Sequence, residues 1–149
     1  MGFVKSNVEV ESYLEEHNLI WYQLKDSEYR ELMKQWRQAF EGLLEESEYE
    51  VYGDSAIEKL KMTLDGGTYI FNTPNYQYLL VTPSAHTATF AYYVEQLNVF
   101  DRELFNRNEA IVCNNGMDFM CAFNHEASVL APELFCQAEK TVAPEITIV

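Results

Sequence analysis

The sequence predicts an α+β fold, in which an antiparallel sheet built from two hairpins carries helices packed mainly on one face. Three observations lead to this prediction. The stretch from Gly66 to Phe100 is rich in aromatic and aliphatic residues and has Glu95 as its only charged side chain, which is typical of buried sequence. Two turn signals, Thr73-Pro74-Asn75 and Asn115-Gly116, each separate two strand-like runs. Apolar residues at helical spacing fill much of the remaining chain.

The length of 149 residues predicts a single globular domain over 1–149, with the residues from about 141 onward as a tail or an edge strand. No apolar run approaches the roughly 20 residues that span a bilayer, and the N-terminus lacks the pattern of a secretory signal. We therefore expect a cytoplasmic protein. Cys113, Cys121 and Cys136 are odd in number and form no CxxC pair, so we expect free buried thiols rather than a disulfide framework or a zinc site.

Two helices are predicted in the N-terminal third. The first runs from about Asn7 to Glu16 behind the capping box Ser6 to Glu9. The short apolar run Leu19 to Tyr22 follows, which favours a strand over a helix-to-helix connection. The second helix covers roughly residues 27–46, with Asp26 as its cap. Its apolar residues fall at i, i+3 and i+4 spacings: Tyr29, Leu32, Met33, Trp36, Phe40, Leu43 and Leu44.

The middle of the chain predicts a short helix over residues 55–64 and a first hairpin. Its strands are 68–72 and 76–81, joined by the Pro/Asn turn. The segment 82–98 has apolar residues spaced for a helix, but its β-branched residues leave a strand as the alternative. Residues 101–105 are expected to add one further helical turn, capped by Asp101.

A second hairpin is predicted over residues 109–124, because Asn115-Gly116 is the strongest two-residue turn signal. A two-residue turn would place Cys113 opposite Asp118 and on the other face from Cys121. A disulfide between these two cysteines would then be impossible. A last short helix is expected to open at Pro132, with the apolar residues Leu134, Phe135 and Ala138.

The strongest compositional feature is the charge of −14, from 24 acidic and 10 basic residues. Direct binding to nucleic acid is disfavoured because phosphates would be repelled, and anionic membrane surfaces are disfavoured for the same reason. A basic protein partner is favoured, since opposite charge accelerates encounter. The protein itself is expected to be a monomer or a homodimer.

An acidic stretch from Glu41 to Asp54 contains six acids and no base, with tyrosines among them. A solvated surface is one interpretation. The other is a partner-binding surface, because tyrosine supplies contact area at low entropic cost and carboxylates supply charge complementarity. The residues predicted to form this contact are Glu45, Glu46, Glu48, Tyr49, Glu50, Tyr52 and Asp54.

No catalytic signature is found: the chain has no HExxH, no GxSxG and no phosphate-binding glycine loop, so no metal or cofactor is expected. The pair His125 and Glu126, at the end of the second predicted hairpin, is a secondary candidate site for a small enzyme or a ligand-binding protein. An oligomerisation module that uses surplus aromatic residues such as Tyr92 and Phe100 is a further alternative.

Several short segments carry a resemblance to a known class of proteins: Asp101 to Phe105, Glu109 to Asn114, Asp118-Phe119 and His125-Glu126. Together they resemble a pattern of small, acidic, single-domain bacterial proteins, several of which are immunity proteins that neutralise a toxin. The resemblance covers residues 101–135 and transfers no residue roles. It favours a bacterial binding protein. Together with the net charge, the acidic stretch and the absence of a catalytic signature, it leads us to expect a non-enzymatic inhibitor that binds a basic, nucleic-acid-directed toxin.

Overall fold

The computed structural model describes residues 4–40, 50–64, 66–72, 89–97, 101–123 and 133–137. Seven strands form one sheet in the order β1-β4-β3-β5-β6-β7-β2, and every neighbouring pair is antiparallel. The predicted α+β class is therefore confirmed. The elements are α1 (Val8–Glu16), β1 (Trp21–Gln23), α2 (Asp26–Phe40), β2 (Glu50–Tyr52), α3 (Gly53–Thr63), β3 (Thr68–Phe71), β4 (Ala91–Val94), α4 (Arg102–Arg107), β5 (Ile111–Asn114), β6 (Phe119–Phe123) and β7 (Glu133–Gln137).

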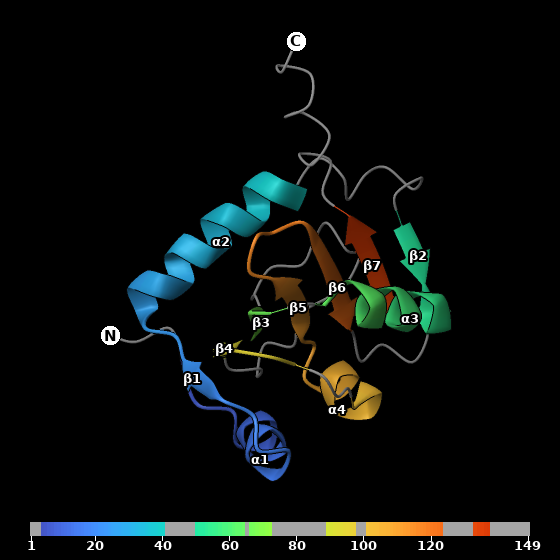
Figure 1. The fold of residues 1–149 in the computed structure, drawn as a ribbon. Coiled ribbons are helices and arrows are strands. Elements are labelled where there is room, and N and C mark those ends of the chain that lie inside the picture. Colours follow the sequence, from blue (N-terminus) through green and yellow to red (C-terminus); the bar gives the residue numbers. More distant parts are fainter. Residues whose placement is uncertain are drawn as a thin grey trace.

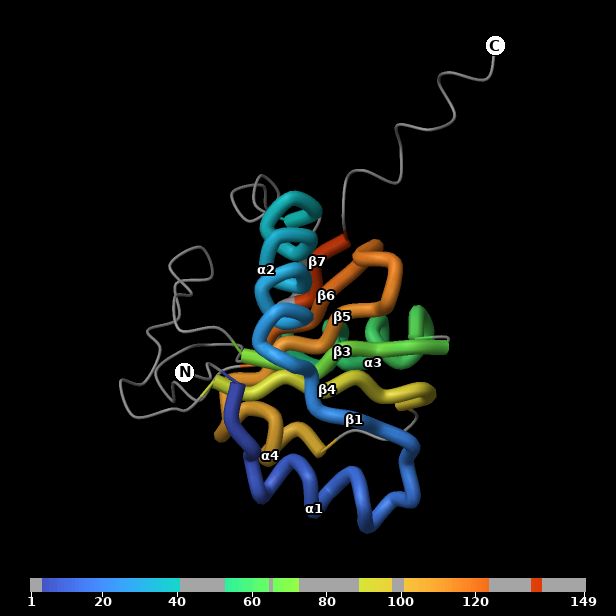
Figure 2. Tube along the Cα trace, turned by 90° about the vertical axis from the view of Figure 1, so that its left-hand side faces the viewer, coloured from blue at the N-terminus to red at the C-terminus, as the bar shows by residue number. Residues whose placement is uncertain are grey.

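The described helices lie on both faces of the sheet, three on one and one on the other. Helices α1, α3 and α4 bury Leu14, Leu60 and Phe105 against one face. Helix α2 packs Trp36 and Phe40 against the opposite face. Figure 1 shows α2 on one side of the sheet and α3 and α4 on the other, and Figure 2 shows α2 crossing over the strands. The sheet therefore has apolar side chains on both faces.

Helix α1 is capped by Asn7 and is followed by a residue in the left-handed region. The Asn7 side chain accepts a hydrogen bond from the backbone N–H of Val10, so the cap lies one residue beyond the predicted Ser6. At the other end Asn18 has φ 57°, and the Leu19 N–H donates to the Leu14 carbonyl at 3.0 Å. This six-to-one bond ends the helix and turns the chain into β1.

Helix α2 matches the prediction at its start, and residues beyond Phe40 lie outside the described ranges. Asp26 is its first residue, and its carboxylate accepts from the Val4 N–H at 3.0 Å. The Lys25 N–H donates to Glu28 at 2.8 Å, which occupies one of the amides at the helix start. The periodic apolar residues Tyr29, Leu32, Met33, Trp36 and Phe40 are all buried, as the spacing predicted.

Residues 91–94 form a strand, so the helix expected in that segment is wrong and the alternative is confirmed there. Tyr92 and Val94 enter the core beneath α1, whereas Tyr93 lies on the α2 side. This alternation is the two-residue period of a strand. Both edges of β3 are occupied, by β4 and by β5. The predicted partner strand 76–81 lies outside the described residues.

The second predicted hairpin is confirmed as β5 and β6, with a register two residues away from the expected one. Cys113 pairs with Met120 instead of Asp118. The turn is longer because the Asn114 side chain accepts from the N–H groups of Asp118 (2.7 Å) and Phe119 (3.2 Å). A shift of two residues leaves each side chain on its predicted face.

The expected cysteine chemistry follows from this register. Cys113 and Cys121 lie on opposite faces of the sheet, and all three cysteines, Cys136 included, are buried and form no disulfide. Burial raises the pKa of the Cys113 thiol well above its ordinary value. The thiol is therefore held protonated in the core, where it acts as a small apolar group.

The predicted helix after Pro132 is wrong, because residues 133–137 form β7. This strand lies between β6 and β2, and its consecutive residues Phe135 and Cys136 belong to the cores on opposite faces of the sheet. A helix could not send two adjacent side chains to opposite sides of a sheet. Non-local pairing therefore overrides the local helical spacing.

Candidate protein-binding surface

Most of the sequence-predicted site residues lie outside the described ranges, namely Glu45, Glu46, Glu48, Tyr49, His125 and Glu126. Glu50 and Tyr52 are the first and last residues of β2, at one edge of the described sheet. Asp54 lies in the first turn of α3, its side chain is 90% exposed, and it pairs with Arg102 at 2.5 Å. The structure therefore places three of the seven predicted contact residues at this edge.

A different acidic surface lies at the opposite edge of the sheet, where α1 runs beside β1 (Figures 1 and 2). A groove of about 500 Å³ is lined there by Val8, Glu11, Ser12, Glu15, Glu16 and Trp21. Helix α1 contains four glutamates and no basic residue. Glu9 pairs with Arg107 at 2.9 Å, but among the described residues the three groove glutamates have no basic partner. Within the described part of the chain, the negative charge of the groove is therefore uncompensated.

Hydrogen bonds hold two of these glutamates against the sheet. The Tyr92 hydroxyl donates to Glu11 at 2.6 Å and accepts from the Asn7 N–H at 2.7 Å. The Trp21 indole N–H donates to Glu15 at 2.9 Å, and its ring meets that of Tyr92 edge to face at 5.4 Å. The indole and the carboxylates are therefore oriented before any partner arrives, which lowers the entropic cost of binding.

Replacing Tyr92 with phenylalanine is expected to lower the free energy of unfolding by about 1–3 kcal/mol, because two bonded groups lose their partner. Tyr13 provides the matched control, since its buried hydroxyl has no hydrogen-bond partner among the described residues. Tyr13→Phe is expected to be neutral or stabilising. Urea unfolding of both variants measures the difference, and equal losses would show that the Tyr92 bonds add nothing to stability.

Exposed apolar side chains lie at this end of the sheet. Val8 is 74% exposed, Ile20 is 65% exposed and Tyr22 is 49% exposed. Val8 is in the groove wall, whereas Ile20 and Tyr22 flank Trp21 in the chain. Apolar and aromatic side chains beside charged ones are the usual composition of protein interfaces.

On the α2 side of the sheet, the same end carries a row of three tyrosines. Tyr22, Tyr93 and Tyr69 pair directly across β1, β4 and β3, and the ring centroids are 5.3 and 5.2 Å apart. A Cβ atom at Gly67 would collide with the Tyr93 hydroxyl, so the ring lies directly over that glycine. Aromatic cover of a glycine is a known stabilising device in sheets.

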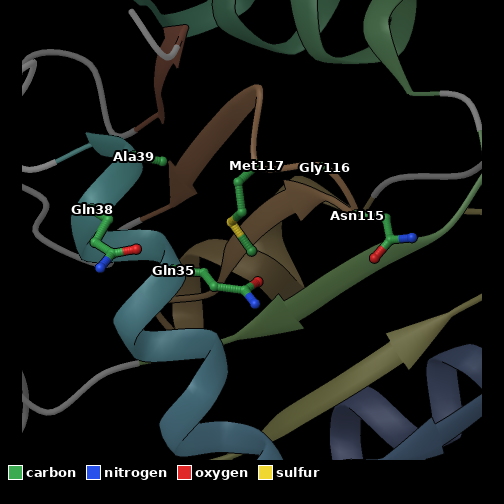
Figure 3. Close-up of a pocket in the computed structure, with 6 residues that line it drawn as sticks. All are labelled: Gln35, Gln38, Ala39, Asn115, Gly116 and Met117. Atoms are coloured by element: carbon green, nitrogen blue, oxygen red, sulfur yellow. The ribbon is translucent and has the colours of Figure 1, made fainter. Parts of the chain in front are cut away.

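A second cavity, of about 300 Å³, lies between α2 and the β5–β6 turn (Figure 3). Its lining residues are Gln35, Gln38, Ala39, Asn115, Gly116 and Met117. None of the six is titratable. The lining therefore offers hydrogen bonds from amides, but it has no group of its own for acid–base catalysis.

Within the described ranges, no cluster of three or more His, Cys, Asp or Glu residues could hold a metal ion. In the same ranges, no helix is long and apolar enough to cross a membrane.

Comparisons of the chain with models of protein families, with curated proteins and with solved structures found no match. The fold and the acidic groove therefore define the class as a small α+β protein with a candidate protein-binding surface.

The groove residues Glu11, Glu15 and Trp21 are absent from the sequence-based site prediction. One signal was available, because Glu11 and Glu15 are one helical turn apart in a helix without a basic residue. The proximity of Trp21 is not visible in the sequence, since it depends on how α1 packs beside β1.

Proposed function

We propose that this protein is a non-enzymatic inhibitor that binds a basic protein partner through the groove between α1 and β1. An immunity protein that blocks a bacterial toxin is the class that fits best, with the groove glutamates covering a positively charged, substrate-binding surface of the toxin. The observation that carries this proposal is the groove itself: three carboxylates without a basic partner in the described chain, next to Trp21.

The physical argument combines charge with an apolar anchor. Carboxylates at the rim of an interface steer a basic partner and set the salt dependence of its association. Trp21 and the exposed Val8 supply the apolar area from which affinity arises. The net charge of −14 extends the attraction beyond the contact itself.

The experiment is capture of a stoichiometric basic partner from the native host at low salt, with native mass spectrometry of the eluate. The double variant Glu15→Lys/Glu16→Lys is then compared with Glu58→Lys, a charge reversal of an exposed side chain on α3. We expect the double variant to weaken binding at least about tenfold and to flatten its salt dependence, because two steering charges change sign. Glu58→Lys is expected to have little effect.

The predicted contact at the β2 edge is tested in the same assay by reversing Glu48, Glu50 and Asp54. If that triple variant loses the partner while the α1 variant keeps it, the contact lies at β2. If neither variant changes affinity or salt dependence, the proposal of an acidic inhibitory surface is wrong.

A further inference from the structure

Strand β1 ends the described sheet, and its outward-facing backbone groups can be identified from its bonds to β4. The Glu95 N–H donates to the Ile20 carbonyl, and the Leu24 N–H donates to the Ala91 carbonyl, each at 2.9 Å. In an antiparallel pair, bonded and non-bonded residues alternate. The backbone N–H and C=O groups of Ile20, Tyr22 and Leu24 therefore face β4. The N–H and C=O groups of the two residues between them, 21 and 23, face away from the sheet.

The α1 groove lies beside this outward edge. Trp21 lines it from β1, while Glu11, Glu15 and Glu16 line it from α1. An edge strand flanked by a helix is the arrangement in which β-strand addition takes place, since the edge supplies backbone bonds and the helix contacts alternate side chains.

We propose that an extended segment of the basic partner adds to β1 as a further strand, with lysine or arginine side chains directed at the α1 glutamates. This inference rests on the proposed function and specifies how the partner is held. The backbone groups at positions 21 and 23 can pair with an extended chain of any sequence. The selection for basic residues therefore comes from the carboxylates.

The spacing of the charges supports this occupant. Glu11 and Glu15 are four residues apart, which is a rise of about 6 Å along a helix. Alternate side chains of a strand on the same face are about 6.6–6.8 Å apart. Basic residues at every second position of the added strand therefore match the two carboxylates. The Trp21 ring, which bonds Glu15 through its indole N–H, favours a cation over its face.

The other side chains of the added strand would face the opposite side of the sheet. Tyr22 lies there, 49% exposed, at the end of the row formed with Tyr93 and Tyr69. An apolar residue at these alternate positions would cover the exposed ring. The segment that fits is thus one in which basic and apolar residues alternate.

A substitution at Gln23 separates backbone pairing from side-chain contact. The Gln23 N–H faces outward, so Gln23→Pro removes that donor without breaking the ladder to β4. Gln23→Ala keeps the N–H and loses only the side chain, whose oxygen accepts from the Ser6 hydroxyl at 3.2 Å. The two variants therefore form a matched pair, and their unfolding midpoints check that both remain folded.

The probe is a synthetic peptide of alternating lysine and valine, titrated into the full chain by calorimetry. We expect one saturable site, at least about tenfold weaker in Gln23→Pro and within about twofold of the wild type in Gln23→Ala. The amides of Trp21 and Gln23 should gain protection from hydrogen exchange in the complex.

A peptide methylated on the backbone nitrogens of one edge keeps its charge and should bind at least about tenfold less tightly, which tests the pairing even if Gln23→Pro unfolds.

Equal binding by Gln23→Pro and Gln23→Ala would overturn strand addition, as would full affinity for the methylated peptide or the lack of a saturable site. The proposed function fails in a different way, when the Glu15/Glu16 reversal leaves capture of the native partner unchanged. If binding of the partner depends on those glutamates but not on the Gln23 N–H, the proposed function stands and strand addition is wrong.

Discussion

Replacing Trp36 with alanine is expected to lower the free energy of unfolding by about 3–5 kcal/mol. Trp36 is 2% exposed, its ring meets Phe71 edge to face at 6.2 Å, and its indole N–H points at the Met120 sulfur at 3.0 Å. It belongs to the core that joins α2 to the sheet. Because domains of this size are stable by only about 5–15 kcal/mol, one such cavity removes a large share of the total.

Trp36→Phe is the control for this prediction, since it keeps an aromatic ring and removes the indole N–H. We expect it to cost less than half as much as the alanine variant, because most of the buried area remains. Urea unfolding followed by circular dichroism measures both. An alanine variant that loses less than about 1 kcal/mol would mean that α2 does not depend on this side chain.

The parts of the fold that the sequence predicted correctly are those decided by local signals. The apolar stripe of α2 has a 3.6-residue period over four turns, and Trp36 and Phe40 are buried as that period requires. The Asn115-Gly116 turn is also local, and it indicated a hairpin there. Its length was misjudged because the Asn114 side chain takes two backbone N–H groups, which a two-residue turn would not allow.

The errors lie where distant strands decide the structure. Residues 91–94 have helical spacing, yet they lie between β1 and β3 and alternate between the two cores. Residues 133–137 are placed in the same way between β6 and β2. A local window contains neither partner strand, so it cannot weigh the ladder bonds that a strand gains. The α1 groove was missed for the same reason, since Trp21 reaches Glu15 only after α1 has packed.

Alkaline solution is expected to destabilise the protein steeply above about pH 10, through three buried tyrosines. Tyr13, Tyr29 and Tyr92 are each at most 7% exposed, and burial raises the pKa of each phenol above its ordinary value near 10. In the unfolded chain they lose their protons near pH 10, whereas the folded chain retains them. The stabilisation is therefore complete below about pH 10 and is lost as the pH rises further.

Each tyrosine that stays protonated contributes a slope of about 1.4 kcal/mol per pH unit, so three contribute about 4 kcal/mol per unit. The pKa of Cys113 is also raised by burial, so this thiol adds to the slope of the unfolding free energy, with the same sign, from about pH 8.5. Unfolding free energies in urea at several pH values between roughly 9 and 11 measure the slope. Tyr13→Phe should remove about a third of the tyrosine part, and an unchanged slope in that variant would contradict the assignment.

The same titration reaches the groove through Tyr92, because its hydroxyl proton is the one that Glu11 accepts. If that proton were lost, a phenolate and a carboxylate would face each other at hydrogen-bond distance, and like charges repel. The folded chain therefore retains this proton, and we expect the groove to keep its shape until the whole chain unfolds. Tyr92→Phe should bind the peptide more weakly already at neutral pH. The wild type and Tyr92→Phe should then lose affinity in parallel as the lysines of the peptide lose their charge near about pH 10.4, and a steeper loss in the wild type would show that Tyr92 ionises in the folded chain.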